Sequence, residues 1–408
     1  MKMAKSYDVT IVGGGLAGLG LTALLSVQGF AVACIDNTAP KQALTEKFDG
    51  RTTAISWASQ KVLEAAGVWD ALAPDACPIN DIQILDGDSP VLLEFESQDV
   101  GGQSFGWIIE NRLIRKALYK SVAKSKNVDF FAPARVTDFS VDDEKAVTKL
   151  ADGSEISSKL IVGADGKNSF TREWMDIPVR GWSYNQHAIV TIIKHEKLHQ
   201  NIAIEHFRAE GPFAVLPMTD APDGAHRSSL VWTQHGSKDK SALSYDEDTF
   251  NMALNARFPK FYGDVKCISQ RFAYPLGLKH AYSYIGERMC LVAEAAHAMH
   301  PIAGQGLNMG FRDIAELATL LISAREKGRD IGASSLLKSY QQARRADNTL
   351  MMGATDSLNK LFSNRMPGLG PLRKLGVRAV SHFPPAKQFF MKQAMGATGL
   401  LPTLIQDK

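Results

Sequence analysis

Cysteine is scarce in this chain: 4 of its 408 residues are cysteine, and no two of them stand in Cys-x-x-Cys spacing. A chain of this length can build its core without disulfides, and a structural zinc site needs closely spaced thiol or imidazole ligands. The composition therefore predicts reduced thiols, no metal site and a cytoplasmic location. Cys34 lies in an apolar run and is expected to be an ordinary core residue.

A strong excess of one charge is also missing, because the formal net charge is +3. Lys and Arg residues do not form a stripe interleaved with aromatic side chains, so no nucleic-acid partner is expected. Five glycines interrupt the apolar stretch of residues 9–27, which therefore resembles neither a membrane span nor a signal peptide. The 45% of hydrophobic residues instead predicts a globular protein, and the length of 408 residues favours two or more domains.

Glycine, by contrast, is concentrated near the start of the chain. Residues 7–12 and 31–35 are apolar and predict two strands, and residues 15–28 between them have helical spacing. Gly13, Gly15 and Gly18 form a Gly-x-Gly-x-x-Gly motif where the first strand meets the helix. Such glycines allow a tight turn and bring backbone N–H groups close to a pyrophosphate. Asp36 follows the second strand, where a carboxylate accepts hydrogen bonds from a ribose, so the unit predicts dinucleotide binding.

Two further segments distinguish FAD from NAD. The first, residues 163–169, reads Gly-Ala-Asp-Gly-Lys-Asn-Ser and is followed by Arg172. Taken alone, its Asp-Gly pair fits a simple turn after a strand. The second, residues 295–308, predicts a loop that opens a helix, whose positive N-terminal end would face the flavin where negative charge collects on reduction. His297 and His300 in this loop lack a third metal ligand and are expected to be structural.

With these segments, nearly the whole chain resembles the ubiquinone-biosynthesis hydroxylases, within the FAD monooxygenases typified by 4-hydroxybenzoate hydroxylase. The most specific element is the string His-Pro-Ile-Ala-Gly-Gln-Gly-Leu-Asn of residues 300–308. Further matching segments are residues 49–54, residues 107–113, Glu205-x-Phe207, Gly211-Pro212, Leu216-Pro217, Trp232 and Tyr274-Pro275-Leu276.

The resemblance implies a role for each of a set of residues. The ADP half of FAD would be held by Gly13, Gly15, Ala17, Gly18 and Asp36. Arg51 and Arg112 would contact the phosphates or the ribityl chain, although either fits a solvated surface arginine as well. Val136 would touch the adenine through its backbone, and Asp165 would brace the fold near the cofactor. The flavin ring would be lined by Gly304, Gln305, Gly306, Leu307 and Asn308.

One departure from the family pattern affects the cofactor site. The family has Gly-Asp before Ala-Ala-His, where this chain has Ala293-Glu294. Glu294 keeps the carboxylate that would bind the ribityl chain but carries it on a longer side chain. Ala293 adds a methyl group where the backbone is expected to pass close to the cofactor. We therefore expect weaker FAD binding than in a member with Gly-Asp.

The resemblance also implies the reaction. NAD(P)H would reduce the flavin, O₂ would add to give a C4a-hydroperoxyflavin, and one oxygen atom would pass to the ring of a polyprenylated phenol. A second dinucleotide motif is missing, because Pro371 follows Gly368-x-Gly370 at once, so the nicotinamide would bind only transiently. No catalytic acid or base can be named; Tyr184 and His187 are candidates by position only.

Acidic residues are absent between Asp356 and Asp407. The basic residues of this stretch are Lys360, Arg365, Arg373, Lys374, Arg378, Lys387 and Lys392. They fit packed helices with solvated charges, and equally a basic, apolar surface for an anionic membrane or for other ubiquinone-biosynthesis proteins. In the second case the protein would lie on the inner face of the membrane.

The expected fold class is α/β: a Rossmann-like FAD-binding domain, a second β-sheet substrate domain and a helical C-terminal region. The FAD-binding domain would comprise residues 1–180 and 273–340, the sheet domain residues 181–272 and the helical region residues 341–408. Residues 51–123 are expected to be mainly helical, with a hairpin at residues 82–95. Three other functions stay open: a prenyl reductase, a halogenase, although the Trp-x-Trp-x-Ile-Pro string of flavin halogenases is missing, and a flavin-poor accessory protein.

Overall fold

The computed structural model describes residues 6–44, 48–87, 93–208, 210–362, 383–397 and 402–406. Its first sheet has the predicted strand–helix–strand unit at its centre: β1 (Ser6–Val12), α1 (Leu16–Val27) and β2 (Val32–Ile35). Parallel pairing gives the order β19-β11-β1-β2-β8, which is a Rossmann-like arrangement. The other strands of this sheet are β8 (Val128–Phe131), β9 (Val136–Val141), β10 (Ala146–Leu150), β11 (Glu155–Gly163), β18 (Ile285–Gly286) and β19 (Met289–Leu291).

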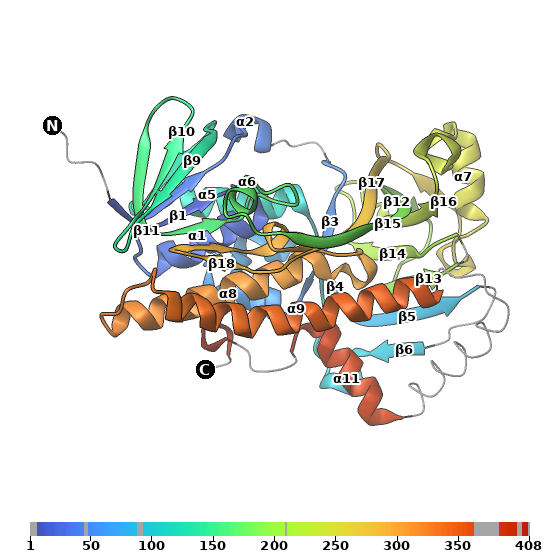
Figure 1. The fold of residues 1–408 in the computed structure, drawn as a ribbon. Helices are drawn as coiled ribbons and strands as arrows, with labels where there is room; N and C mark the ends of the chain where they lie inside the picture. The colour runs from blue at the N-terminus through green and yellow to red at the C-terminus, as the bar shows by residue number, and fades with distance from the viewer. Residues whose placement is uncertain are drawn as a thin grey trace.

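The second sheet has nine strands in the order β20-β17-β12-β15-β14-β13-β5-β6, with β16 paired to β12. It lies beside the first sheet, with α7 (Glu247–Asn255) at its far end (Figure 1). Its strands are β5 (Asp81–Asp86), β6 (Leu93–Glu96), β12 (Val179–His195), β13 (Ile202–Phe207), β14 (Phe213–Met218), β15 (His226–His235), β16 (Val265–Cys267), β17 (Phe272–Ala281) and β20 (His297–Ala298).

The expectation that residues 51–123 are mainly helical is wrong. This segment contributes the three-stranded sheet β3-β7-β4 and the hairpin β5–β6, and that hairpin joins the second sheet by parallel pairing of β5 with β13. Strands this short are fixed by partners far away in the chain, which local periodicity does not reveal. The small sheet comprises β3 (Thr52–Ser56), β4 (Cys77–Ile79) and β7 (Gly106–Glu110). The helices of the segment are α3 (Trp57–Ala65), α4 (Trp69–Leu72) and α5 (Asn111–Lys124).

The long helices follow the sequence prediction more closely. The helix that the loop of residues 295–308 is expected to open is α8 (Gln305–Glu326), and α9 (Ser334–Phe362) runs beside it along one side of the molecule (Figure 1). α11 (Pro384–Met395) packs Met391 and Met395 into the core below the second sheet. Two short α-helices, α2 (Pro40–Ala43) and α6 (Phe170–Trp174), also lie within the described residues.

The two faces of the second sheet have different neighbours. One face, with Ile204, Leu230 and Trp232, packs against Phe250 and Leu254 of α7 in a closed core. The other face, with Ala203 and Ile192, packs against residues of β7, β3 and α11. This second face is therefore turned toward the small sheet β3-β7-β4 and toward α11.

Candidate functional site

The glycine-rich loop between β1 and α1 combines two roles. Gly13 has a φ of +113°, and a Cβ on it would overlap the backbone of Ala164; a Cβ on Gly18 would overlap the carbonyl oxygen of Gly13. These two glycines are therefore required by the fold itself. Gly15 is different, because it is exposed and a Cβ on it would meet no atom within 4 Å. Its α-carbon and the start of α1 face open space, as the approach of a pyrophosphate requires.

Asp36 holds this loop in shape. Its carboxylate accepts hydrogen bonds from the backbone N–H of Gly14 (2.6 Å) and of Thr38 (2.6 Å). A carboxylate has acceptor sites for about four hydrogen bonds, so the group can still accept from a ribose hydroxyl. Its predicted contact with the cofactor stays a prediction.

Three segments that are far apart in the sequence meet beside this loop. They are the first turn of α1, the turn at Ala293 and the first part of α8: a Cβ on Gly310 would lie 2.8 Å from Cβ of Ala293 and 3.9 Å from Cβ of Ala17. Glu294 is exposed next to this junction, and the described residues offer no partner to its carboxylate. Gly306, in the first turn of α8, is exposed, and a Cβ on it would meet nothing within 4 Å. Open glycines, a helix N-terminus and a free carboxylate fit the phosphates and hydroxyls of FAD.

Ala293 departs from the expectation for this position. Its φ of +54° lies in the left-handed region that favours glycine, and its methyl group faces Gly310 of α8. Gly310 provides the space for this methyl group, and the expected crowding of the cofactor stays a prediction. The cost of Ala293 lies in its backbone conformation, typically about 1–3 kcal/mol for a residue other than glycine.

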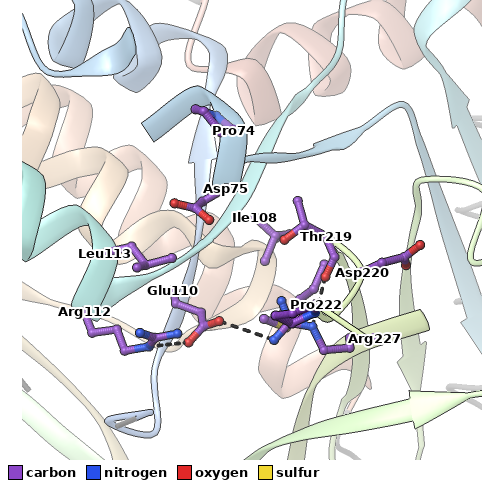
Figure 2. A pocket seen from close by; sticks show the side chains of 11 residues that line it. Pro74, Asp75, Ile108, Glu110, Arg112, Leu113, Thr219, Asp220, Pro222 and Arg227 are labelled. Carbon is purple, nitrogen blue, oxygen red and sulfur yellow. Dashed lines mark hydrogen bonds and ion pairs between the residues drawn. The ribbon is translucent and has the colours of Figure 1, made fainter. Parts of the chain in front are cut away.

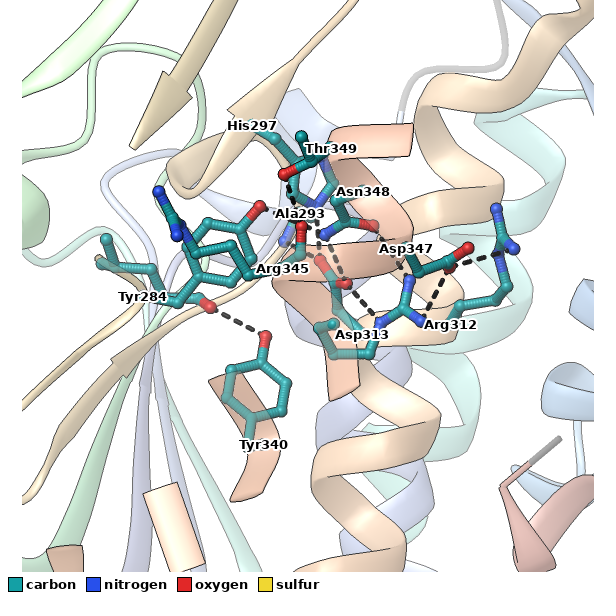
Figure 3. Close-up of polar contacts among 12 residues, drawn as sticks. Tyr284, Ala293, His297, Arg312, Asp313, Tyr340, Arg345, Asp347, Asn348 and Thr349 are labelled. Carbon is teal, nitrogen blue, oxygen red and sulfur yellow. Dashed lines mark hydrogen bonds and ion pairs between the residues drawn. The ribbon is translucent and has the colours of Figure 1, made fainter. Parts of the chain in front are cut away.

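A buried polar network holds Ala293 in this conformation (Figure 3). Asp313 of α8 is fully buried, and its carboxylate accepts hydrogen bonds from the backbone N–H of Ala293 (3.0 Å) and from Nε2 of His297 (2.5 Å). On its other side it accepts from Nε of Arg344 (2.9 Å) and Nδ2 of Asn348 (3.1 Å), both on α9. Burial alone would raise the pKa of Asp313, but His297 and Arg344 outweigh it and hold this pKa well below its usual range.

Sequence reasoning missed Asp313 and its two partners on α9. The available signal was a carboxylate within the apolar face of a long helix, which is rarely tolerated unless the charge is paired. The partners lie 31 and 35 residues further along the chain, so their pairing could not be read from spacing.

Asp165 caps the start of α6. It accepts hydrogen bonds from Oγ of Ser169 (2.5 Å) and from the backbone N–H of Thr171 (2.8 Å). The buried Arg172 of the same segment donates to the carbonyl oxygen of Ala295 (2.8 Å). The string of residues 163–172 therefore ties the first sheet to the turn that carries Glu294.

Three further residues predicted from the resemblance have other neighbours in the structure. Arg51 is exposed, with its guanidinium 4.8 Å from the centre of the Tyr274 ring. Arg112 donates from Nε to Glu110 (2.7 Å) and is turned toward a pocket of about 250 Å³, which Arg227 also lines (Figure 2). Val136 begins β9 of the first sheet and packs against apolar residues of the same sheet. Their contacts with FAD stay predictions.

The loop at the start of α8 is tied to β3. Asn308 is buried: its amide nitrogen donates to the carbonyl oxygens of Ala54 (2.8 Å) and Gly304 (3.0 Å), and its oxygen accepts from the backbone N–H of Ser56 (3.0 Å). Gln305 donates to the carbonyl oxygen of Ala394 at 3.4 Å. Asn308 therefore fixes the loop, and Gly304, Gly306 and the half-buried Leu307 are the members left to line a ligand.

The two positional candidates for acid–base catalysis have other partners. The hydroxyl of Tyr184 donates to Asp356 (2.8 Å), and Nδ1 of His187 lies 3.2 Å from the carbonyl oxygen of Gly236. Burial lowers the pKa of His187, which favours its neutral form. Neither contact indicates a catalytic role.

The amino-acid sequence is similar to those of several curated proteins. The chain is 41% identical to the ubiquinone hydroxylase UbiL of Rhodospirillum rubrum over 98% of this chain and 91% of that protein. It is 31% identical to the 3-demethoxyubiquinol 3-hydroxylase of Escherichia coli, covering 95% of this chain and 98% of the other. The human ubiquinone biosynthesis monooxygenase COQ6 is also 31% identical, with 94% and 92% covered.

Solved structures share the fold at lower sequence identity. PqsL of Pseudomonas aeruginosa, described as a probable FAD-dependent monooxygenase, superposes with a TM-score of 0.77 at 20% identity, covering 92% of this chain and all of that one. The p-nitrophenol 4-monooxygenase PnpA of Pseudomonas putida gives a TM-score of 0.77 at 17% identity, with 97% and 100% covered. The predicted α/β fold class of the 4-hydroxybenzoate hydroxylase type is thereby confirmed.

The family model that describes an FAD binding domain matches residues 6–355. This range contains the glycine loop, the Asp165 cap, the turn at Ala293 and the start of α8. The chain therefore belongs to the FAD-binding-domain family and, within it, to the ubiquinone-biosynthesis hydroxylases.

Proposed function

We propose that this protein is an FAD-dependent monooxygenase that hydroxylates the ring of a polyprenylated phenol in ubiquinone biosynthesis, using NAD(P)H and O₂. The observation that carries the proposal is the meeting of the open Gly15 loop, the exposed Glu294 and the Gly304–Gly306 turn around one junction. The ubiquinone hydroxylases named above support the same substrate class.

FAD, when bound, would supply the redox chemistry and the activation of O₂. The protein's own residues bind and orient. The N–H groups at the start of α1 would bind the pyrophosphate, and the carboxylate of Glu294 would accept a hydrogen bond from a hydroxyl of the ribityl chain. The start of α8, fixed by Asn308, would present its N–H groups to the flavin ring. The face of the second sheet that carries Ala203 and Ile192 would exclude water from the reacting ring.

The test is incubation of the purified protein with FAD, NAD(P)H, O₂ and 2-prenylphenols, with mass spectrometry for the gain of one oxygen atom. We expect a product 16 mass units heavier than the phenol, from the mass of one oxygen, and flavin absorbance in the purified protein. A protein that purifies without flavin and binds none on titration would instead be the accessory protein.

We further propose that α11 lies on a membrane surface. Two phenylalanines of α11 are strongly exposed, Phe389 (53%) and Phe390 (45%), as is Phe383 (60%), which directly precedes the helix. Lys392 is exposed on the same helix, whereas Lys387 pairs with Asp99 and Lys360 with Asp356. Exposed aromatic residues beside lysine suit the interface of an anionic bilayer.

The basic residues Arg365, Arg373, Lys374 and Arg378 lie outside the described residues. In the part of the chain that the structure covers, no helix is long and apolar enough to span a membrane.

Replacing Phe389 and Phe390 together by serine is expected to reduce binding to phosphatidylglycerol-containing vesicles by at least about tenfold. Burial of one aromatic side chain contributes about 1.5–3 kcal/mol, and the two rings would leave the bilayer together. Vesicle sedimentation measures the effect, and binding should also weaken as salt rises. Phe261→Ser, at a site near α7 that is 40% exposed, serves as the control. Equal vesicle binding by the double variant and the control contradicts the proposal.

A further inference from the structure

One row of side chains crosses the second sheet on the face that is turned toward the FAD-binding elements. The strand registers align Ile84 with Glu205, Glu205 with Ala214, Ala214 with Val231, Val231 with Val190, and Val190 with Phe272. Register partners in a sheet point to the same face. The row is thus apolar from end to end except at Glu205.

Both ends of this row contact segments of the cofactor site. At the Phe272 end, a Cβ on Gly50 would overlap the Phe272 ring, and Thr52 donates a hydrogen bond to Ser229 (2.7 Å). At the Glu205 end, Ile84 and Phe207 pack against Ile302, which lies two residues before Gly304. Phe207 is on the same face as Glu205, because side chains two residues apart in a strand share a face. Glu205 therefore lies on the sheet face that packs against the loop opening α8.

The carboxylate of Glu205 is half-buried and lacks a protein partner. Within the described residues it makes no hydrogen bond or ion pair, and its sheet neighbours are Ile84, Ala214, Ala203 and Phe207. Burial raises the pKa of Glu205 to about 7. A half-buried carboxylate without a partner costs stability, and its retention at such a position is typical of a functional site.

We propose that Glu205 binds the phenol hydroxyl of the substrate and takes its proton during ring hydroxylation. This inference rests on the proposed function and adds a catalytic residue to it. The apolar row from Ala214 to Phe272 would receive the ring and the first isoprene units of its tail, with the hydroxyl at the carboxylate.

The proposed step is a simple proton transfer. The O–H bond of the phenol breaks, its electron pair stays on the phenol oxygen, and the proton forms a new O–H bond with the Glu205 carboxylate. The resulting phenolate has a more electron-rich ring, which reacts faster with an electrophilic oxygen atom. A base with a pKa near the working pH suits this role, and general-base catalysis typically contributes about 10²–10⁴-fold.

The test compares Glu205→Gln with the unaltered protein on two probes, 2-geranylphenol and its O-methyl ether. Gln keeps the size of the side chain but does not accept a proton. We expect kcat/KM for the phenol to fall by at least about 10²-fold. The ether has no proton to lose, so both proteins should act on it at the same low rate.

Several controls separate this role from a structural one. Glu205→Gln should bind FAD normally and have an unchanged or higher thermal midpoint, because it removes an unpaired buried charge. Glu96→Gln, at an exposed position on β6 of the same sheet, should behave like the unaltered protein. Equal phenol hydroxylation by Glu205→Gln overturns the inference alone, whereas failure of the unaltered protein on every phenol overturns the proposed function.

Discussion

Gly15→Val is expected to fold normally and to lose FAD binding by at least about 100-fold. A side chain at this position meets no protein atom within 4 Å, and the φ of −73° is accessible to valine, so the fold has no reason to change. The added side chain would occupy the space through which the pyrophosphate approaches the start of α1, and an overlap of this size outweighs the few hydrogen bonds gained there. FAD titration by fluorescence quenching and thermal unfolding of the flavin-free protein measure the two effects separately.

Two other glycines give matched comparisons for this variant. Gly353→Val in α9 also meets nothing within 4 Å, and it should leave both FAD binding and folding nearly unchanged. Gly18→Ala should fail at folding, because its Cβ would overlap the carbonyl oxygen of Gly13. Tight FAD binding by Gly15→Val would show that the pyrophosphate lies elsewhere.

Asp313→Asn is expected to lower the free energy of unfolding by about 3 kcal/mol, since it removes the buried carboxylate that pairs with His297 and Arg344 and leaves Arg344 with Asp347 as its ion-pair partner. It should also weaken FAD binding, because the hydrogen bond to the N–H of Ala293 holds the turn that presents Glu294. The folded-state pKa of Asp313 is lowered, so this group stabilises the protein above its unfolded pKa of about 3.9. That contribution is lost as the pH falls below this value, and urea unfolding across pH 3–6 should show a shallower decline for the variant.

Ala293→Gly tests whether Asp313 acts on FAD through this turn. Glycine adopts the left-handed conformation at little cost, so it should restore part of the FAD affinity in the Asp313→Asn background. The change should have a smaller effect in the unaltered protein, and FAD titrations of all four proteins give the coupling between the sites. If Asp313→Asn lowers FAD affinity by the same factor with Ala293 and with glycine at this position, Asp313 affects FAD by another route, such as α9.

The sequence predicted the parts of this fold that depend on local residue patterns. The unit of residues 7–36, the strands of residues 181–272 and the long helix at residue 307 follow from periodicity and glycine placement. Strands β3, β4 and β7 did not, because each is short and depends on partners elsewhere in the chain.

The candidate site divides in the same way. Gly15 and Glu294 could be located from motifs. The left-handed backbone of Ala293, the pairing of Asp313 with Arg344 and the alignment of Glu205 with Ala214 depend on tertiary contacts across the sheet and between α8 and α9.

The order of the strands in the first sheet also determines when each strand finds its partner during translation. β10 pairs with residues 155–158 of β11, but β19, the partner of residues 161–163, begins only at Met289. The edge of β11 at residues 161–163 therefore stays unpaired while much of the second sheet is translated. At translation rates of about 5–20 residues per second, this interval lasts roughly 6–25 seconds. The turn at Ala293 and the α8–α9 pair leave the ribosome later still. The nascent chain therefore exposes an open strand edge before it has a complete flavin site, and shielding by a chaperone would matter most in that period.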